Sequence, residues 1–260
     1  MKVKSALNWP TEYVKCFAYG VPRSGKTHLG GTFPDPIWLD FEDGLMTIRR
    51  TIMDLGKPDV PILTPTSWGE VVAFAMNPVR SVENALKGTP FEGYQFKSII
   101  VDTVSTMEDL CFTKILGDEF AGPEISDYKT FGRQMRPFFA QMWKLPYNVC
   151  LLAHTYHGGI EIKDKKTGTV KPAAPPGPLL SGAIREQGPG LSDFYLHLYT
   201  ELIGSRVLYY ADATMRDGYP AGVRGVADFF DKRVTNPNYQ QMRDALDKLE
   251  NLKKKGGENV

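Results

Sequence analysis

The chain has 260 residues, of which 42% are hydrophobic, and its 31 lysines and arginines nearly balance 30 aspartates and glutamates. This composition is sufficient for a substantial core in one domain. It excludes a surface that is basic all over, so any contact with nucleic acid must come from local segments.

Three cysteines lie far apart in apolar runs, which predicts buried free thiols rather than a metal site. They are Cys16, Cys111 and Cys150. No run approaches the roughly 18 apolar residues of a membrane helix, and no apolar leader follows the first residues. We therefore expect a cytoplasmic protein with no membrane partner.

Four short apolar runs, rich in β-branched and aromatic residues, predict buried strands of a parallel sheet. They cover residues 12–20, 36–43, 96–103 and 147–155. Helix-compatible segments alternate with them, at residues 67–86, 104–116 and 127–145. The alternation predicts an α/β fold with a mostly parallel core and with functional residues at the C-terminal ends of the strands.

The composition changes after His154. Residues 158–178 predict a β-hairpin followed by a proline-rich loop, because charged and apolar residues alternate around a Lys-Thr-Gly turn. Residues 191–203 predict a helix capped by Ser192, and residues 205–214 predict another strand.

The last residues predict an amphipathic helix that fades into a polar, lysine-rich tail. We therefore expect one core domain over residues 1–235, with a loop insertion at 158–190, and a C-terminal segment over 236–260.

The stretch GVPRSGKT at residues 20–27 matches the pattern G-x-x-x-x-G-K-[ST]. In this pattern backbone amides surround a phosphate, Lys26 lies between the β- and γ-phosphates, and the Thr27 hydroxyl binds Mg²⁺. An apolar strand precedes the stretch and a helix start follows it, as the motif requires. The sequence thus predicts a site for ATP and Mg²⁺. Its residues are Gly20, Pro22, Arg23, Ser24, Gly25, Lys26, Thr27 and His28.

Two further strand ends supply carboxylates. Asp102 ends SIIVD and is the second predicted Mg²⁺ ligand. Many P-loop motors of the AAA+ type have their catalytic glutamate next, where this chain has Thr103. In WLDFEDG, strand alternation puts Asp40 and Glu42 on the same side. Glu42 is the predicted general base and Asp40 a structural or supporting residue.

The setting of Glu42 resembles that of RecA-type ATPases, whose catalytic glutamate follows the strand after the P-loop helix. In RecA-type and replicative-helicase cores a polar residue ends a later strand and relays the γ-phosphate to DNA-binding loops; here NVCLLAH places His154 there. The segment YYADATMRDG resembles the strand and K-x-R-N-G turn of hexameric replicative helicases. Thr214 replaces the lysine but Arg216 remains, as an arginine finger acting in trans, with Arg224 as the alternative.

Together these motifs, over residues 13–230, resemble the phage-encoded RecA-core ATPases associated with single-strand annealing, the Sak group. The resemblance implies a RecA-like P-loop NTPase core without further domains. It also implies a homo-oligomer, ring or filament, in the host bacterial cytoplasm. Single-stranded DNA and a phage single-strand-binding protein are the implied partners.

RecA-like cores bind DNA through two loops, which correspond here to residues 117–137 and 158–190. Basic residues beside aromatics such as Tyr128 and Phe131 suit phosphate contacts and base stacking on a single strand. The candidate DNA-binding residues are Lys129, Arg133, Arg136, Lys163, Lys165, Lys166, Lys171 and Arg185.

The resulting expectation is ATP-dependent binding of single-stranded DNA that promotes strand annealing or exchange in phage recombination or replication. Two alternatives remain open from the sequence. The chain could be a minimal ring helicase or translocase, or a nucleotide-gated module that recruits a nuclease or primase and hydrolyses ATP slowly.

Overall fold

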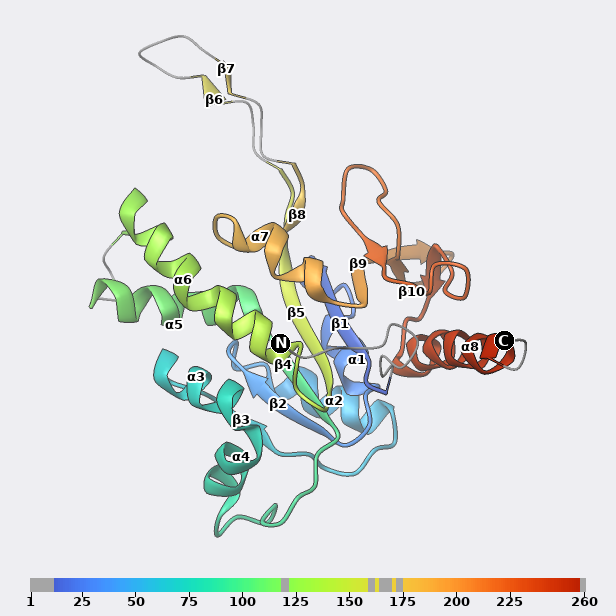
Figure 1. Cartoon of the computed structure of the whole chain (residues 1–260), viewed down its shortest axis with the longest axis horizontal. Coiled ribbons are helices and arrows are strands. Elements are labelled where there is room, and N and C mark those ends of the chain that lie inside the picture. Colours follow the sequence, from blue (N-terminus) through green and yellow to red (C-terminus); the bar gives the residue numbers. More distant parts are fainter. Residues whose placement is uncertain (1–11, 118–121, 159–161, 164–169, 172–174, 258–260) are drawn as a thin grey trace.

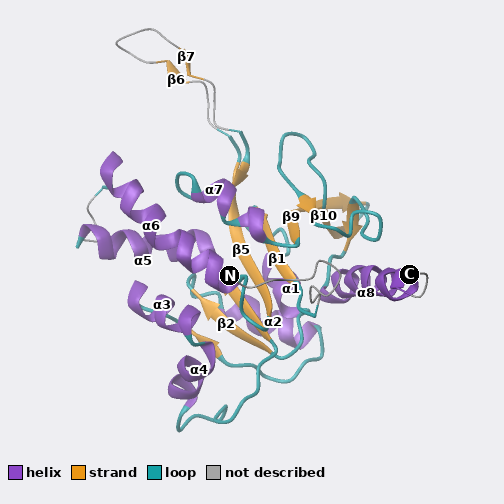
Figure 2. Cartoon of the chain, viewed as in Figure 1, coloured by secondary structure: helices purple, strands orange, loops and turns teal. Residues whose placement is uncertain are grey.

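The computed structural model describes residues 12–117, 122–158, 162–163, 170–171 and 175–257. In Figure 1 and Figure 2 they form three layers, a central sheet with helices packed on both faces. The predicted α/β class with a mostly parallel sheet is confirmed.

Six parallel strands form the centre of the sheet, in the order β9-β1-β5-β4-β2-β3. Their bounds are β1 Lys15–Gly20, β2 Pro36–Asp40, β3 Ile62–Leu63, β4 Ser98–Asp102, β5 Asn148–Tyr156 and β9 Phe194–Ile203. β1, β2, β4 and β5 are the four predicted strands. β5 separates the P-loop strand from the strand that ends in Asp102. This is the arrangement of a RecA-like P-loop NTPase core.

Antiparallel strands complete the sheet on the far side of β9. They are β10 Arg206–Asp212, β11 Gly222–Val223 and β12 Arg233–Thr235. β10 pairs with β9 and β12, and β11 pairs with β9. The strand predicted over residues 205–214 is thus confirmed.

The helix predicted over residues 191–203 is wrong, because this segment is strand β9. Phe194, Leu196 and Leu198 are buried and the residues between them are partly exposed, which is a period of two. Ser192 caps no α-helix; its hydroxyl donates to the Pro189 carbonyl at 2.7 Å. The alternation of apolar and polar residues along this segment predicts a strand better than the capping residue Ser192 predicts a helix.

Alternation along the buried strands also divides the core in two. Phe17, Val101 and Leu151 face one side of the sheet. Cys16 and Cys150, between or beside them in sequence, face the other. Both faces are apolar because both are covered by helices. All three cysteines are free and buried, as predicted.

The helices are distributed between these two faces. Packed on the first are α3 Trp68–Met76, α4 Pro78–Leu86, α5 Val104–Leu116, α6 Ile125–Met142 and α7 Ile184–Gln187. Packed on the second are α1 Lys26–Gly31, α2 Leu45–Asp54 and α8 Tyr239–Gly257. A 3₁₀ turn, Pro189–Leu191, follows α7.

The single helical segment predicted over residues 67–86 is two helices that meet at Asn77. A residue before proline disfavours the α conformation, so α3 ends there. The Asn77 side chain then accepts the Arg80 N–H at 3.1 Å and Pro78 occupies the first helical position, which begins α4.

The insertion after β5 contains the predicted hairpin in its described part. β6 Ile162–Lys163 and β7 Val170–Lys171 pair antiparallel in a sheet of their own. β8 Gly177–Pro178 then returns to pair with the end of β5. In Figure 1 the hairpin projects away from the helices and the central sheet.

The first half of α8 belongs to the same core as the sheet. Met242, Ala245 and Leu246 are buried against the second face. The division of the chain at residues 235 and 236 stays a prediction. Within the described residues, no helix has the length and apolar character that a membrane crossing requires.

Two leucines of β9 test its assignment. Leu196 is fully buried, so Leu196→Ala should lower the free energy of unfolding by about 2–5 kcal/mol. Leu202 lies on the same strand with 72% of its surface exposed, so Leu202→Ala should change it by less than about 0.5 kcal/mol. Urea denaturation measures both; equal losses would contradict the assignment.

Candidate functional site

The P-loop connects β1 to α1 and depends on the backbone freedom of Gly25. Gly25 has φ of 91°, and a Cβ there would stand 2.6 Å from the Tyr209 ring. Arg23 also has a positive φ, of 67°. These angles turn the chain sharply between β1 and α1. The loop residues from Gly20 to His28 thus lie where the motif predicts, although α1 itself extends for only six residues.

Lys26 is almost completely buried at the base of this loop. Its Nζ donates to the carbonyls of Gly20 at 2.9 Å and Val21 at 3.0 Å. Burial lowers the pKa of Lys26, and the nearby carboxylates of Asp102 and Glu42 oppose that shift. An ammonium group taken out of water in this way is stabilised by anionic groups that enter the site.

Thr27 and Asp102 form the predicted metal-binding pair. The Thr27 hydroxyl donates to Asp102 Oδ2 at 2.9 Å. Burial raises the pKa of Asp102 to about 6, with Glu42 and Asp40 adding to the rise and Thr27 and Lys26 opposing it. A carboxylate and a hydroxyl are hard oxygen ligands of the kind that Mg²⁺ takes, usually with substrate phosphates and water as its other ligands. The pair therefore fits Mg²⁺.

Glu42 follows β2 and accepts three hydrogen bonds through Oε1. The donors are Thr103 Oγ1 at 2.6 Å, Thr106 Oγ1 at 2.9 Å and His154 Nε2 at 2.5 Å. Partial burial would raise the pKa of Glu42, but the hydrogen bonds from His154 and Thr103 and the charge of His154 lower it to about 2. The carboxylate is thus ionised at neutral pH and held in one position.

Asp40, the last residue of β2, is buried and supports the loop that carries Glu42. Its Oδ1 accepts the backbone N–H of Glu42 at 3.1 Å, which fixes the start of the loop that carries the glutamate. Asp40 and Asp102 are also direct neighbours across the parallel pair β2–β4. β2 ends at Asp40, so Glu42 reaches His154 from the loop after the strand and not by strand alternation.

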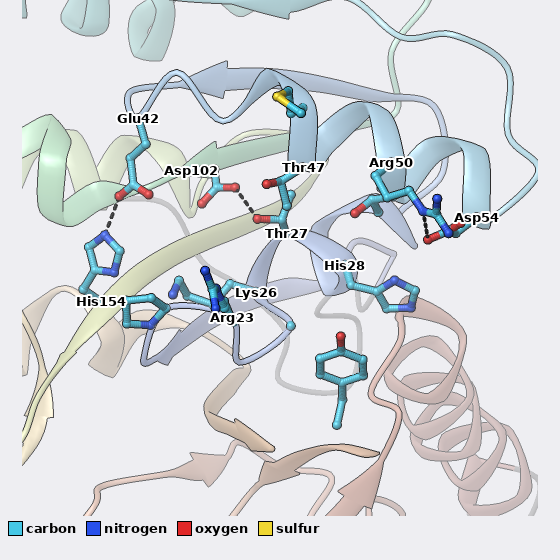
Figure 3. Close-up of a pocket in the computed structure, with 15 residues that line it drawn as sticks. Arg23, Lys26, Thr27, His28, Glu42, Thr47, Arg50, Asp54, Asp102 and His154 are labelled. Atoms are coloured by element: carbon cyan, nitrogen blue, oxygen red, sulfur yellow. Dashed lines mark hydrogen bonds and ion pairs between the residues drawn. The ribbon is translucent and has the colours of Figure 1, made fainter. Parts of the chain in front are cut away.

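One cavity of about 560 Å³ is lined by Lys26, Thr27, Glu42, Asp102 and His154. Figure 3 shows Glu42 and His154 at one end, Thr27 and Asp102 in the middle, and His28, Arg50 and Asp54 at the other end. The structure therefore brings the predicted carboxylates, the P-loop lysine and His154 to a single site at the C-terminal edge of the sheet.

Sequence reasoning missed one wall of this cavity. The residues concerned are Met46, Thr47, Arg50, Thr51 and Asp54 of α2 and Tyr209 of β10. Neither segment carries a phosphate or metal motif, so the sequence offered no chemical signal. Sequence reasoning also missed Thr103 and Thr106, whose hydroxyls donate to Glu42. Thr103 occupies the position where many AAA+ motors have their catalytic glutamate.

Arg216 lies outside this cavity, in the turn after β10. Its Nη1 donates to the Tyr199 hydroxyl at 2.8 Å and lies 3.7 Å from Asp212 Oδ1. Its Nε is 3.5 Å from Asp217 Oδ2. Arg224 donates to the Gly190 carbonyl. Both arginines are exposed, and a role in a neighbouring subunit's site stays a prediction for each.

The helix predicted over residues 127–145 is confirmed as α6, and most of the overlapping DNA loop predicted over residues 117–137 lies in this helix, with residues 118–121 outside the described part. Glu124 and Asp127 form a capping box that starts the helix. Phe131 is buried and stacks on Phe112, with 4.4 Å between the two ring centroids. Its ring therefore offers no surface for a base, and its predicted stacking role is wrong. Tyr128 is 42% exposed. The basic residues Lys129, Arg133 and Arg136 are exposed on α6.

The second predicted loop is described in part. Lys163 and Lys171 lie on β6 and β7, whereas Lys165 and Lys166 fall outside the described residues. Arg185 belongs to α7 and is half-buried, with its guanidinium 4.5 Å from the centre of the Tyr156 ring. It packs against the end of β5 at the base of the hairpin.

Comparison with known families gives one assignment. The family described as AAA domain matches residues 12–218, which is most of the chain. The chain belongs to this family. It is a P-loop ATPase, although Thr103 occupies the position where many AAA+ motors have their glutamate.

Among solved structures, a KaiC-like protein from the hyperthermophilic archaeon Pyrococcus horikoshii OT3 is similar, at 10% identity and a TM-score of 0.41. The match covers 81% of this chain and 82% of that one. No curated protein sequence matches.

The raised pKa of Asp102 predicts a stabilising substitution. Because the folded-state pKa is near 6 and the ordinary value is 3.8, protonation stabilises the fold, and this stability is lost as the pH rises from about 4 through 6. Without nucleotide, Asp102→Asn should therefore raise the free energy of unfolding by about 1–3 kcal/mol at pH 8. The gain should shrink at pH 4.5.

Urea denaturation at the two pH values measures this difference. Asp231→Asn, at an exposed position, is the matched control and should show no such pH dependence. A gain for Asp102→Asn that is the same at both pH values would contradict the assigned cause.

Proposed function

We propose that this ATPase binds single-stranded DNA in an ATP-dependent manner and promotes strand annealing or exchange. One observation carries the proposal: His154, which contacts Glu42 in the cavity, lies on β5, the strand that precedes the hairpin insertion and pairs with β8 after it. Nucleotide chemistry and a candidate DNA-binding element therefore share one strand.

In the proposed reaction, water attacks the γ-phosphorus of ATP and the bond to the β-phosphate oxygen breaks. Lys26, which lies against the carbonyls of Gly20 and Val21, binds the phosphate oxygens. Thr27 and Asp102 would hold Mg²⁺, and the metal would supply positive charge that stabilises the transferred phosphoryl group. Glu42 orients the water and takes its proton.

His154 has a positioning role in this scheme. It shares the Glu42 carboxylate with two threonine hydroxyls, and a carboxylate with pKa near 2 is a weak base. We propose that the γ-phosphate draws the imidazole away from Glu42. Loss of that hydrogen bond raises the pKa of Glu42 and makes the carboxylate a better base when substrate is present.

The backbone of His154 is tied to the root of the insertion. Its N–H donates to Ser105 Oγ at 2.9 Å, and its carbonyl accepts the Leu179 N–H at 2.7 Å. The Ser105 hydroxyl in turn donates to the Leu179 carbonyl at 2.8 Å. A shift of His154 would therefore move the segment that follows the hairpin, which supports a nucleotide-dependent position of the hairpin.

Two basic surfaces are the proposed contacts for DNA. On α6, Lys129, Arg133 and Arg136 are spaced by four and three residues, so they lie on one exposed helical face. The hairpin contributes the lysines of β6 and β7. Because the whole chain has a net charge of +1, affinity would depend on these local groups.

A homo-oligomer would complete the site. Arg216 is exposed and lies away from the cavity of its own chain, which supports its delivery to a neighbouring subunit's ATP. In this chain Tyr199 and Asp212 hold its guanidinium, so assembly would exchange these partners for the phosphate.

A second candidate function is favoured by the Glu42 hydrogen bonds. A carboxylate held by three donors predicts slow basal hydrolysis, as expected of a nucleotide-gated module that recruits another enzyme. In that case Glu42→Gln would leave the DNA-dependent function intact, whereas strand annealing driven by turnover would be altered.

Three variants separate the proposed roles in hydrolysis. Lys26→Ala should abolish measurable ATP binding. Glu42→Gln should retain binding and lower kcat by about 10²–10⁴-fold. His154→Ala should retain binding and lose the stimulation of kcat by single-stranded DNA.

Steady-state ATPase assays with and without single-stranded DNA measure these effects. Glu83→Gln, exposed on α4, is the control for Glu42→Gln. Unchanged kcat in Glu42→Gln would remove Glu42 from the mechanism, and absence of any DNA effect in the wild type would refute the DNA-dependent function.

The α6 surface predicts a change in salt dependence. If Lys129, Arg133 and Arg136 each contact a phosphate, their combined replacement by alanine should reduce the slope of log K against log salt concentration by about 2. Fluorescence anisotropy with a labelled oligonucleotide measures the slope. Arg80→Ala with Lys87→Ala, exposed on and after α4, is the control; an equal effect there would exclude a specific surface.

A further inference from the structure

The first turns of α5 contact two separate parts of the molecule. On one face, Thr103 Oγ1 and Thr106 Oγ1 donate to Glu42 Oε1 at 2.6 and 2.9 Å. On the neighbouring face, Ser105 and Glu108 contact the segment that follows β8. Residues three apart in a helix share a face, so each pair acts from one side of the same helix. α5 therefore connects the candidate general base to the end of the insertion.

Glu108 binds the backbone of Ser181 through its buried carboxyl group. The Ser181 N–H donates toward Oε2 at 2.9 Å and Oε1 at 3.2 Å. Only 4% of Glu108 is exposed, and this contact joins it to a residue 73 positions further along the chain. A buried polar group that loses its partner is costly, so the carboxyl group fixes the position of the Ser181 backbone.

Ser105 provides a second contact with the same segment. Its hydroxyl donates to the Leu179 carbonyl at 2.8 Å and accepts the His154 N–H at 2.9 Å. Ile184, at the start of α7, is 1% exposed in the core that α5 also lines. The chain from β8 to α7 is thus held on α5, and β8 pairs with the end of β5 at the base of the hairpin. The base of the hairpin and the first turns of α5 are therefore one connected unit.

The two sets of contacts on α5 are close together. Thr103 and Glu108 are five positions apart, which is about 8 Å along a helix. Thr103 also caps α5, since its hydroxyl accepts the Thr106 N–H at 3.4 Å. The hydroxyl that begins the helix is thus one of those that donate to Glu42. A displacement of α5 therefore changes the hydrogen bonds of Glu42 directly.

Burial determines the form in which Glu108 acts. It raises the pKa of Glu108 to about 8, with the hydrogen bonds from Ser181 opposing the rise and the charge of Asp109 adding to it. At pH 7 the protonated carboxyl group therefore predominates. Its carbonyl oxygen accepts the Ser181 N–H, and glutamine offers the same acceptor in a similar volume. Glu108→Gln thus keeps the hydrogen bond, whereas Glu108→Ala removes it.

We propose that Glu108 is a positioning residue that couples DNA bound at the hairpin to ATP hydrolysis at Glu42. It holds the segment after β8 on α5, and α5 holds Glu42 through Thr103 and Thr106. This role rests on the proposed function, in which the hairpin binds DNA and Glu42 orients the water. Glu108 is not among the residues that line the nucleotide cavity, so its effect falls on kcat rather than on the KM for ATP.

Steady-state ATPase assays at pH 7, with and without a single-stranded oligonucleotide, test the coupling. In Glu108→Ala the ratio of kcat with DNA to kcat without DNA should fall to about 1, while the KM for ATP changes by less than about twofold. Glu108→Gln should keep the wild-type ratio. Asp109→Ala, at the next and exposed position of α5, is the control and should also keep it.

Hydrogen exchange tests the same contact without DNA. In the wild type, a non-hydrolysable ATP analogue should change the protection of the backbone amides of residues 178–184, because α5 joins this segment to the cavity. The change should be lost in Glu108→Ala and kept in Glu108→Gln. If Glu108→Ala does not fold, Glu108→Met, which fills a similar space without a strong acceptor, provides the second variant for both measurements.

Two results in the ATPase assay would overturn the role of Glu108. One is a wild-type ratio of kcat values in Glu108→Ala or Glu108→Met. The other is a loss in Glu108→Gln as large as the loss in Glu108→Ala, because the hydrogen bond to Ser181 would then not be the cause.

Failure of the proposed function gives a different pattern, in which DNA stimulates neither the wild type nor any variant. Hydrogen exchange then decides the role of Glu108 by itself. A response to the ATP analogue over residues 178–184 that only Glu108→Ala loses would retain the link through α5. No response in the wild type, or the same response in Glu108→Ala, would remove it.

Discussion

Lys26 and Asp102 are buried in the same cavity at the C-terminal edge of the sheet, and each charge offsets part of the cost of burying the other. Each charge opposes the pKa shift that burial causes in its partner. Thr27 adds a hydrogen bond to the carboxylate, and two loop carbonyls hold the ammonium group. The compensation is partial, because burial still lowers the pKa of Lys26 and raises that of Asp102.

Strand order makes this burial feasible. β5 lies between β1 and β4, so the P-loop and Asp102 approach the same cavity from either side of the strand that carries His154. Parallel direction alone brings the ends of β1, β2, β4 and β5 to one edge. The Glu42–His154 hydrogen bond crosses that edge and connects the loop after β2 to the end of β5.

The sequence was informative where chemistry and periodicity agree. A phosphate motif after an apolar strand and a carboxylate ending another predicted Lys26, Thr27 and Asp102, and a second acidic strand end predicted the approach of Glu42. The helix predicted over residues 191–203 is wrong, because Phe194 and Leu196 are buried with the period of two of strand β9. The helix predicted over residues 127–145 is confirmed as α6, but the DNA loop expected over residues 117–137 from the resemblance conflicts with it, because most of that segment is helical. The α2 and Tyr209 wall could not be found, because stacking and shape leave no motif.

The length of α1 has a consequence for how the cavity opens. α1 ends at Gly31 after six residues, and strand β2 begins at Pro36. α2 follows β2 at Leu45 and places Thr47, Thr51 and Asp54 on the cavity wall. Gly31 admits this approach, because a Cβ there would lie 2.4 Å from Thr51. One side of the chamber is therefore a separate, ten-residue helix rather than the rigid sheet edge. The position of this wall therefore depends on how α2 packs against Gly31 of α1, and not on the hydrogen bonds of the sheet.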